Sequence, residues 1–236
     1  MVLTSLLGDR LAPVTYSIGF LSAPPERVVR AARWLYFRWP DAWRRVAVLD
    51  GGLEEALLQL QPLGGFLLPR VLVASTALEG WSAVFDGDAR GQGVRGLSVR
   101  LARALRVPGY FVATAPPALD PGRFPGFRQF YVLGPQTGRD HVRAVWVSEE
   151  EDVGRWHFGT DGEVQPYEDV EAYRRRRHTD RLTERMLVDY AAAVGLRPWE
   201  DSFYRPPFHL ITSLRLGRDR FQRTLAQART EMKLDE

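Results

Sequence analysis

FRQFYVL (127–133), HVRAVWV (141–147) and RWHF (155–158) are three short apolar runs, rich in aromatic and β-branched residues and separated by turn-forming stretches. Runs of this kind predict β-strands that follow one another along the chain. Asp161-Gly162 is a common hairpin turn, so we expect a return strand at 164–167. The block therefore predicts an antiparallel meander, and it is the part of the sequence that decides the fold class.

Working outward, the alternation of Val14, Tyr16, Ile18 and Phe20 with other residues predicts a half-buried strand. Further strands are expected at 71–76, 81–85 and 110–115, and helices at 24–39, 53–60, 97–107, 168–181, 183–194 and 218–234, with 200–213 irregular or a short edge strand. Strands and helices each come partly in runs, which predicts an α+β fold: a largely antiparallel central sheet with flanking helices and a C-terminal amphipathic helix. We expect a single domain at 1–213 and a C-terminal helical appendage at 214–236.

The composition excludes several classes of protein. Hydrophobic residues make up 45% of the 236 residues, enough for a buried core, and the net charge is only +3. The chain has no cysteine, which excludes disulfides and thiolate metal sites. No run approaches the roughly 18 apolar residues of a membrane span, and the apolar stretch at 3–7 lacks a basic region before it. We therefore expect a cytoplasmic protein without a membrane partner.

Motifs that carry chemistry in other proteins are incomplete here. Gly91, Gly93 and Gly96 have the spacing of a dinucleotide fingerprint, but five residues and two acids separate them from the preceding strand. Asp86 and Asp88 lack a third ligand for a metal ion. The histidines have no metal-binding or catalytic spacing, and no nucleophile motif occurs. We expect no cofactor, no metal ion and no catalytic residue.

The run Arg174–Arg177 has the composition of a nucleic-acid patch. Glu171, Asp180 and Glu184, however, lie at helix-neighbour spacings from arginines in or beside the run. We interpret the segment as a solvated, ion-paired helix face.

The least balanced segment runs from Pro24 to Arg45, where six arginines accompany two acids. Helical spacing places the arginines and two aromatic residues away from the apolar stripe. Arginine beside aromatic side chains is typical of protein interfaces and of single-strand nucleic-acid platforms; the alternative is that the rings pack beneath another element. The candidate partner-binding residues are Arg30, Arg33, Trp34 and Phe37 on this helix, and Trp81, Asp86, Asp88 and Arg90 around a second loop.

Several stretches resemble a set of small, uncharacterised actinobacterial cytosolic proteins: Trp81–Asp86, Gly154–Phe158, Pro166–Asp169, Ala172–Arg177, and Ala193–Trp199 with Phe203-Tyr204. In size and α+β layout this set resembles immunity proteins that neutralise toxins delivered between bacteria. The resemblance implies a protein partner, a toxin, that is blocked by direct contact. Because the chain is slightly basic, we expect the target to present an acidic surface.

Three hypotheses follow from the sequence. The first is a cytosolic binding or inhibitory protein, such as an immunity protein that occludes a toxin. The second is a nucleic-acid-associated protein that uses the face at 27–45. The third is an enzyme with a carboxylate site at Asp86, Asp88, Glu168 and Asp169, if the fold gathers them. The sequence leaves the oligomeric state open.

Overall fold

A computed structural model describes residues 6–37, 43–64, 70–116, 124–135, 139–150, 154–214 and 222–234. Within these ranges the strands are β1 (Ser17–Leu21), β2 (Trp43–Leu49), β3 (Val71–Thr76), β4 (Ser82–Asp86), β5 (Gly109–Ala115), β6 (Phe127–Leu133), β7 (Arg143–Glu149), β8 (Trp156–Gly162) and β9 (Tyr204–Leu214). The helices are α1 (Pro25–Phe37), α2 (Leu53–Leu58), α3 (Val94–Leu105), α4 (Glu184–Ala193) and α5 (Leu225–Glu231).

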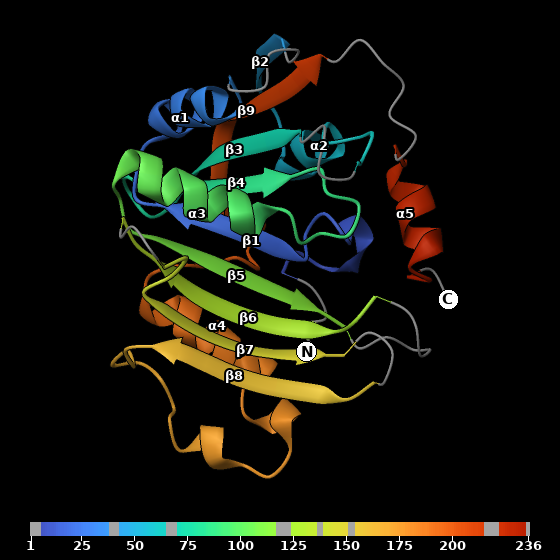
Figure 1. Cartoon of the computed structure of the whole chain (residues 1–236). Helices are drawn as coiled ribbons and strands as arrows, with labels where there is room; N and C mark the ends of the chain where they lie inside the picture. The colour runs from blue at the N-terminus through green and yellow to red at the C-terminus, as the bar shows by residue number, and fades with distance from the viewer. Residues whose placement is uncertain are drawn as a thin grey trace.

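All nine strands join one sheet in the order β2-β9-β3-β4-β1-β5-β6-β7-β8. Every neighbouring pair is antiparallel. Helices α1 and α3 cover one face and α4 lies behind the other (Figure 1). This arrangement confirms the predicted α+β class and its largely antiparallel sheet.

Each face of the sheet has its own hydrophobic core. Val28, Ala32 and Leu101, from α1 and α3, pack on one face. Leu57, Leu187 and Tyr190, from α2 and α4, pack on the other. Because both faces are covered, β1 is buried at all five positions, and the prediction that this strand is half-buried was wrong.

The predicted hairpin at Asp161-Gly162 was also wrong. β8 continues through both residues, and they pair with Ala144 and Arg143 of β7. Gly162 has a positive φ of 85°, and a Cβ there would lie 2.0 Å from the Val142 carbonyl oxygen. The glycine therefore permits close approach at the end of β8, and no strand forms at 164–167.

The segment predicted as irregular or edge strand, 200–213, contains β9, which lies inside the sheet between β2 and β3. The strand contains Pro206 and Pro207, which cannot donate to a strand ladder. The β3–β9 register shifts between Ala74 and Ser75, and this bulge leaves both prolines unpaired. β2 pairs only with residues beyond the prolines, from Phe208 to Leu214.

The return segment, residues 163–203, carries the chain from β8 at one edge of the sheet back to β9. A helix was expected at 168–181, but the structure has only two short 3-10 turns, η2 (Ala172–Arg174) and η3 (His178–Asp180). An ion pair holds the start of this segment against β7. Arg143 Nε and Nη2 donate to the two Glu168 carboxylate oxygens over 2.8 and 2.6 Å.

This pair belongs to a larger buried network. The side chains of Arg143 and Glu168 are only 4% and 1% exposed. Tyr173 donates to Glu168 over 2.7 Å, and the Tyr190 hydroxyl of α4 lies 3.0 Å from that of Tyr173 and accepts from the Asp169 amide. A buried charge pair with its hydrogen bonds satisfied fixes one geometry. The network therefore links β7, the return segment and α4.

The C-terminal helix α5 is shorter than the predicted helix at 218–234, and it docks on its own chain. Ala228 is buried, while Leu225 and Met232 pack on the two cores. Leu63 and Arg223 exchange backbone hydrogen bonds of 2.7 Å just before the helix. Helical spacing predicted an apolar stripe of Leu225, Ala228, Met232 and also Phe221, of which Phe221 lies outside the described residues.

Arg143→Met leaves the Glu168 carboxylate buried without its cation. Breaking one side of a buried pair costs about 3–5 kcal/mol, so we expect a loss of that size in the free energy of unfolding, measured by urea titration with circular dichroism. Arg185→Met is the control, since its pair with Asp189 is 83% and 51% exposed and exposed pairs contribute about 1 kcal/mol or less. Equal small losses in both variants would contradict the anchoring role of Arg143.

Candidate partner-binding surface

Helix α1 separates its apolar and polar residues as the sequence predicts. Pro25 occupies the first turn with Glu26, where a fixed φ and a negative charge favour a helix N-terminus. Val28 and Ala32 are fully buried on the sheet side. The opposite side exposes three arginines and a tryptophan, Arg27, Arg30, Arg33 and Trp34.

Trp34 is the most exposed large hydrophobic side chain that the structure describes, at 63%. The alternative that its ring packs beneath another described element is therefore wrong. Burying a tryptophan against a partner removes a large apolar area from water. The side chain of Phe37, the other predicted aromatic contact, lies outside the described residues.

Helix α3 adds a second row of arginines beside α1. Its buried side packs closely on β1, since a Cβ at Gly19 would lie 1.9 Å from Ser98 Oγ. Its outer side carries Arg95, Arg100 and Arg103, and Arg106 follows as the C-cap. Arg95 and Arg100 are exposed, as is Arg106. The helix contains no acidic residue.

We call the outer sides of α1 and α3 together the arginine surface: Arg27, Arg30, Arg33, Trp34, Arg95, Arg100 and Arg103. The two helices pack against each other on one face of the sheet (Figure 1). They carry six arginines and one acid, Glu26, a net charge of +5 in a chain whose total is +3. The rest of the chain is therefore slightly acidic, and the positive charge is concentrated on this side.

The arginines of this surface differ in the partners that the described residues give them. Arg95 donates to the Tyr131 hydroxyl over 3.3 Å, and Arg103 pairs with Asp140 over 3.1 Å. No ion pair joins Arg27, Arg30 or Arg33 to another residue of the described part of the chain. These three guanidinium groups are available to bind an external carboxylate or phosphate.

The second predicted loop does not form one surface. Trp81 is half-buried and stacks on Tyr110 with ring centroids 5.4 Å apart. Asp88 and Arg90 lie beyond the other end of β4, a strand length of roughly 17 Å away. Asp86 is buried, at 8% exposure. The prediction that Asp86 contacts a partner was therefore wrong. Trp81 lies at one end of β4, and Asp88 and Arg90 lie at the other end, so these three candidates do not share one surface.

Asp86 and Asp88 instead hold the start of α3. Asp88 Oδ2 accepts from the amides of Gln92 and Gly93 over 2.9 and 3.1 Å, and Asp86 Oδ1 accepts from the Asp88 amide over 3.2 Å. A Cβ on Gly93 would lie 2.4 Å from Asp86 Oδ2. Gly93 therefore permits a close approach within the chain, and so does Gly91, where a Cβ would lie 2.1 Å from the Pro13 carbonyl oxygen; a Cβ on Gly96 would meet no atom within 4 Å. Burial, with a smaller effect from the neighbouring Asp88 charge, raises the pKa of Asp86 to about 7.

The four carboxylates of the enzyme hypothesis are not brought together. Asp86 lies in β4 on the α3 side of the sheet, and Glu168 binds Arg143 of β7 on the α4 side. Four strand spacings separate β4 from β7, a distance of about 19 Å. Among the residues that the structure describes, no cluster of three histidine or acidic side chains could hold a metal ion. A shared site at Asp86, Asp88, Glu168 and Asp169 is therefore excluded.

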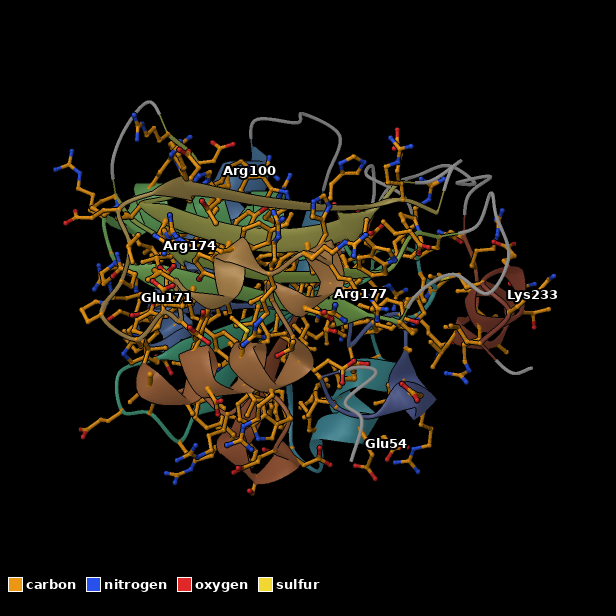
Figure 2. The ribbon with its side chains drawn as sticks, turned by 90° about the horizontal axis from the view of Figure 1, so that it is seen from below. Glu54, Arg100, Glu171, Arg174, Arg177 and Lys233 are labelled. Carbon is orange, nitrogen blue, oxygen red and sulfur yellow. The ribbon has the colours of Figure 1, made fainter. Side chains whose placement is uncertain are left out.

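The arginine run at 174–177 is partly paired, although the predicted helix is absent. Arg174 binds Glu171 over 3.1 Å. Arg175 lies 3.7 Å from Asp169 and donates to the Asp180 carbonyl. The labelled Glu171, Arg174 and Arg177 lie on the return segment (Figure 2). Acidic residues around the run reduce its net charge, whereas α3 contains no acidic residue that would reduce the charge of its arginines.

Sequence reasoning missed two parts of this side of the molecule. The absence of acids from 94–106, with arginines spaced along an amphipathic helix, would have indicated the α3 row. β2 was read as part of the basic segment, although Val46 and Val48 alternate with Arg45 and Ala47 as in a strand.

The chain matches no protein-family model, no curated protein and no solved structure. The resemblance to actinobacterial proteins therefore stays a prediction. Among the described helices, none is both long enough and apolar enough to cross a bilayer.

Asp86→Asn removes a carboxyl whose folded pKa is raised from 3.8 to about 7. As the pH rises, the unfolded chain loses this proton near pH 3.8, whereas the folded chain keeps it until about pH 7. Between these two pH values the free energy of unfolding of the wild type therefore falls by about 1.4 kcal/mol per pH unit, and above the folded pKa it levels off. We expect the stability of the variant relative to wild type to rise from pH 4 to 7, measured by urea unfolding at several pH values. Asp189→Asn on the exposed side of α4 is the control, and a variant difference independent of pH would contradict the burial effect.

Proposed function

We propose that the chain is a binding protein that docks an acidic surface of a protein partner on its arginine surface, and blocks that partner by direct contact. The observation that carries the proposal is the exposed Trp34 among three arginines that have no ion pair within the described part of the chain. Tryptophan and arginine are enriched among the residues that dominate binding energy.

Charge indicates the nature of the partner. The two helices carry +5, and α3 has no acid, so a partner with carboxylates would be attracted and a basic partner repelled. Guanidinium groups bind carboxylates with two parallel hydrogen bonds, which also fixes orientation. The charge would speed association, while Trp34 would slow dissociation.

A protein partner is favoured over single-stranded nucleic acid by the aromatic residues. Single-strand platforms stack successive bases on several aromatic rings along a basic groove. The described part of the arginine surface exposes one large aromatic ring, that of Trp34. The ring of Tyr131, whose hydroxyl accepts a hydrogen bond from Arg95 of α3, is buried. One anchor surrounded by arginine is the pattern of a protein interface.

The immunity role is the specific form of this proposal. It is supported by the resemblance in size and α+β layout, and by a mechanism that needs no catalytic residue. The partner would then be a toxin with an acidic surface, bound in the cytosol.

We expect Trp34→Ala to weaken partner binding at least tenfold, since truncating a central aromatic anchor costs on the order of 2 kcal/mol. The test is to capture partners from source cells with the tagged full chain, to identify the protein that the variant fails to retain, and to measure both affinities by calorimetry. Equal retention of every captured protein by wild type and variant would sink the proposal.

Reversing Arg30 and Arg33 to glutamate should lower the association rate and reduce its salt dependence. The matched control reverses Arg174 and Arg185, whose side chains are 79% and 83% exposed away from the arginine surface. We expect the control to bind as wild type. If instead a thymidylate homopolymer binds, with affinity falling steeply as salt rises, the surface is a nucleic-acid site.

A further inference from the structure

The two edges of the sheet differ in how they are protected. β8, at one edge, contains Gly159 and Gly162, and η3 packs on it, with His178 Nδ1 bonded to the Trp156 carbonyl. β2, at the other edge, pairs with β9. Within the described residues, nothing pairs with the outer side of β2.

β2 lacks two of the features that usually prevent strand addition, a bulge and a proline, although it carries the charges of Arg44 and Arg45. Its register with β9 is continuous from Trp43 to Leu49, with no bulge and no proline. Natural edges are blunted by such interruptions, by charges or by a covering element. An uninterrupted edge of seven residues offers a row of main-chain donors and acceptors to an extended segment.

The side chains of β2 add an apolar contact beside this edge. Val46 packs on the core beneath α1 and α3, and Val48 points to the same face because side chains alternate along a strand. Val48 is 59% exposed. An added strand would cover Val48 with its own side chains.

Charge decides between the possible occupants. α1 packs over β3 and β9, so the helix that carries Arg27, Arg30 and Arg33 lies near this edge. Arg45 is exposed on β2 itself, on the face of the sheet opposite α1. A second copy paired edge to edge would bring two such basic regions together, which is unfavourable. An acidic segment would meet complementary charge instead.

We propose that an extended acidic segment of the partner adds to β2 as a tenth strand. The inference rests on the proposed function and specifies which part of the partner is recognised. The segment would alternate apolar and acidic residues, so that main-chain pairing gives affinity and side chains give selectivity.

The probe is a dye-labelled, end-blocked peptide of alternating valine and glutamate, long enough to pair with all of β2, and binding to the full-length protein is measured by fluorescence anisotropy. We expect saturable binding at micromolar to millimolar concentrations of the peptide. When every second amide of the peptide is N-methylated, along one of its two hydrogen-bonding edges or along the other, we expect binding to weaken at least tenfold. Methylation keeps the charge and removes main-chain donors. Equal binding of plain and methylated peptides, or no binding, would overturn strand addition.

Val48→Glu and Val164→Glu form a matched pair of variants, because both valines are exposed, at 59% and 51%, and both changes add one negative charge. We expect weaker peptide binding in the first and wild-type binding in the second. Equal effects would contradict the assignment to β2. These results are independent of whether the captured partner needs Trp34, so the inference and the proposed function fail separately.

Discussion

The insertion of β9 between β2 and β3 is the constraint on which the rest of the structure depends. It gives β2 the one strand partner that the described residues supply, and it joins the late part of the chain to the early part. To reach this place the chain must cross the sheet from β8, and the buried pair of Arg143 and Glu168 fixes the start of that crossing. Loop closure over such a distance is costly in entropy, and the polar network and α4 offset that cost.

The same path divides the surface by chemistry. The return segment and α4 cover one face and bring acids next to the arginine run at 174–177. The other face is covered by α1 and α3, whose arginines have few acids beside them. Positive charge, an exposed tryptophan and an open sheet edge therefore occur on one side of the molecule. The proposed function rests on these three features lying together, because the fold class by itself implies no function.

Local patterns predicted much of the fold, and non-local contacts account for the errors. Alternation and helical spacing predicted β6, β7 and α1, and placed Trp34 away from the apolar stripe of the helix, but left open whether another element covers its ring. β9 was expected only as an irregular segment or a short edge strand, and its place inside the sheet depends on the bulge that lets β3 pair on both sides of Pro206-Pro207. The helix predicted at 168–181 is absent; Glu168 instead binds an arginine 25 residues earlier in the sequence, a contact that no local pattern encodes. The burial of Asp86 depends on where α3 docks, which no local pattern encodes.

The most direct test of the arginine surface is amide hydrogen exchange, followed by mass spectrometry, on the full chain with and without the captured partner protein. We predict slower exchange at 25–37 and 94–106, with 184–193 unchanged, because contact excludes water from the covered helices. Slower exchange confined to α4 and the return segment, with α1 and α3 unaffected, would place the partner on the opposite face and contradict the central claim.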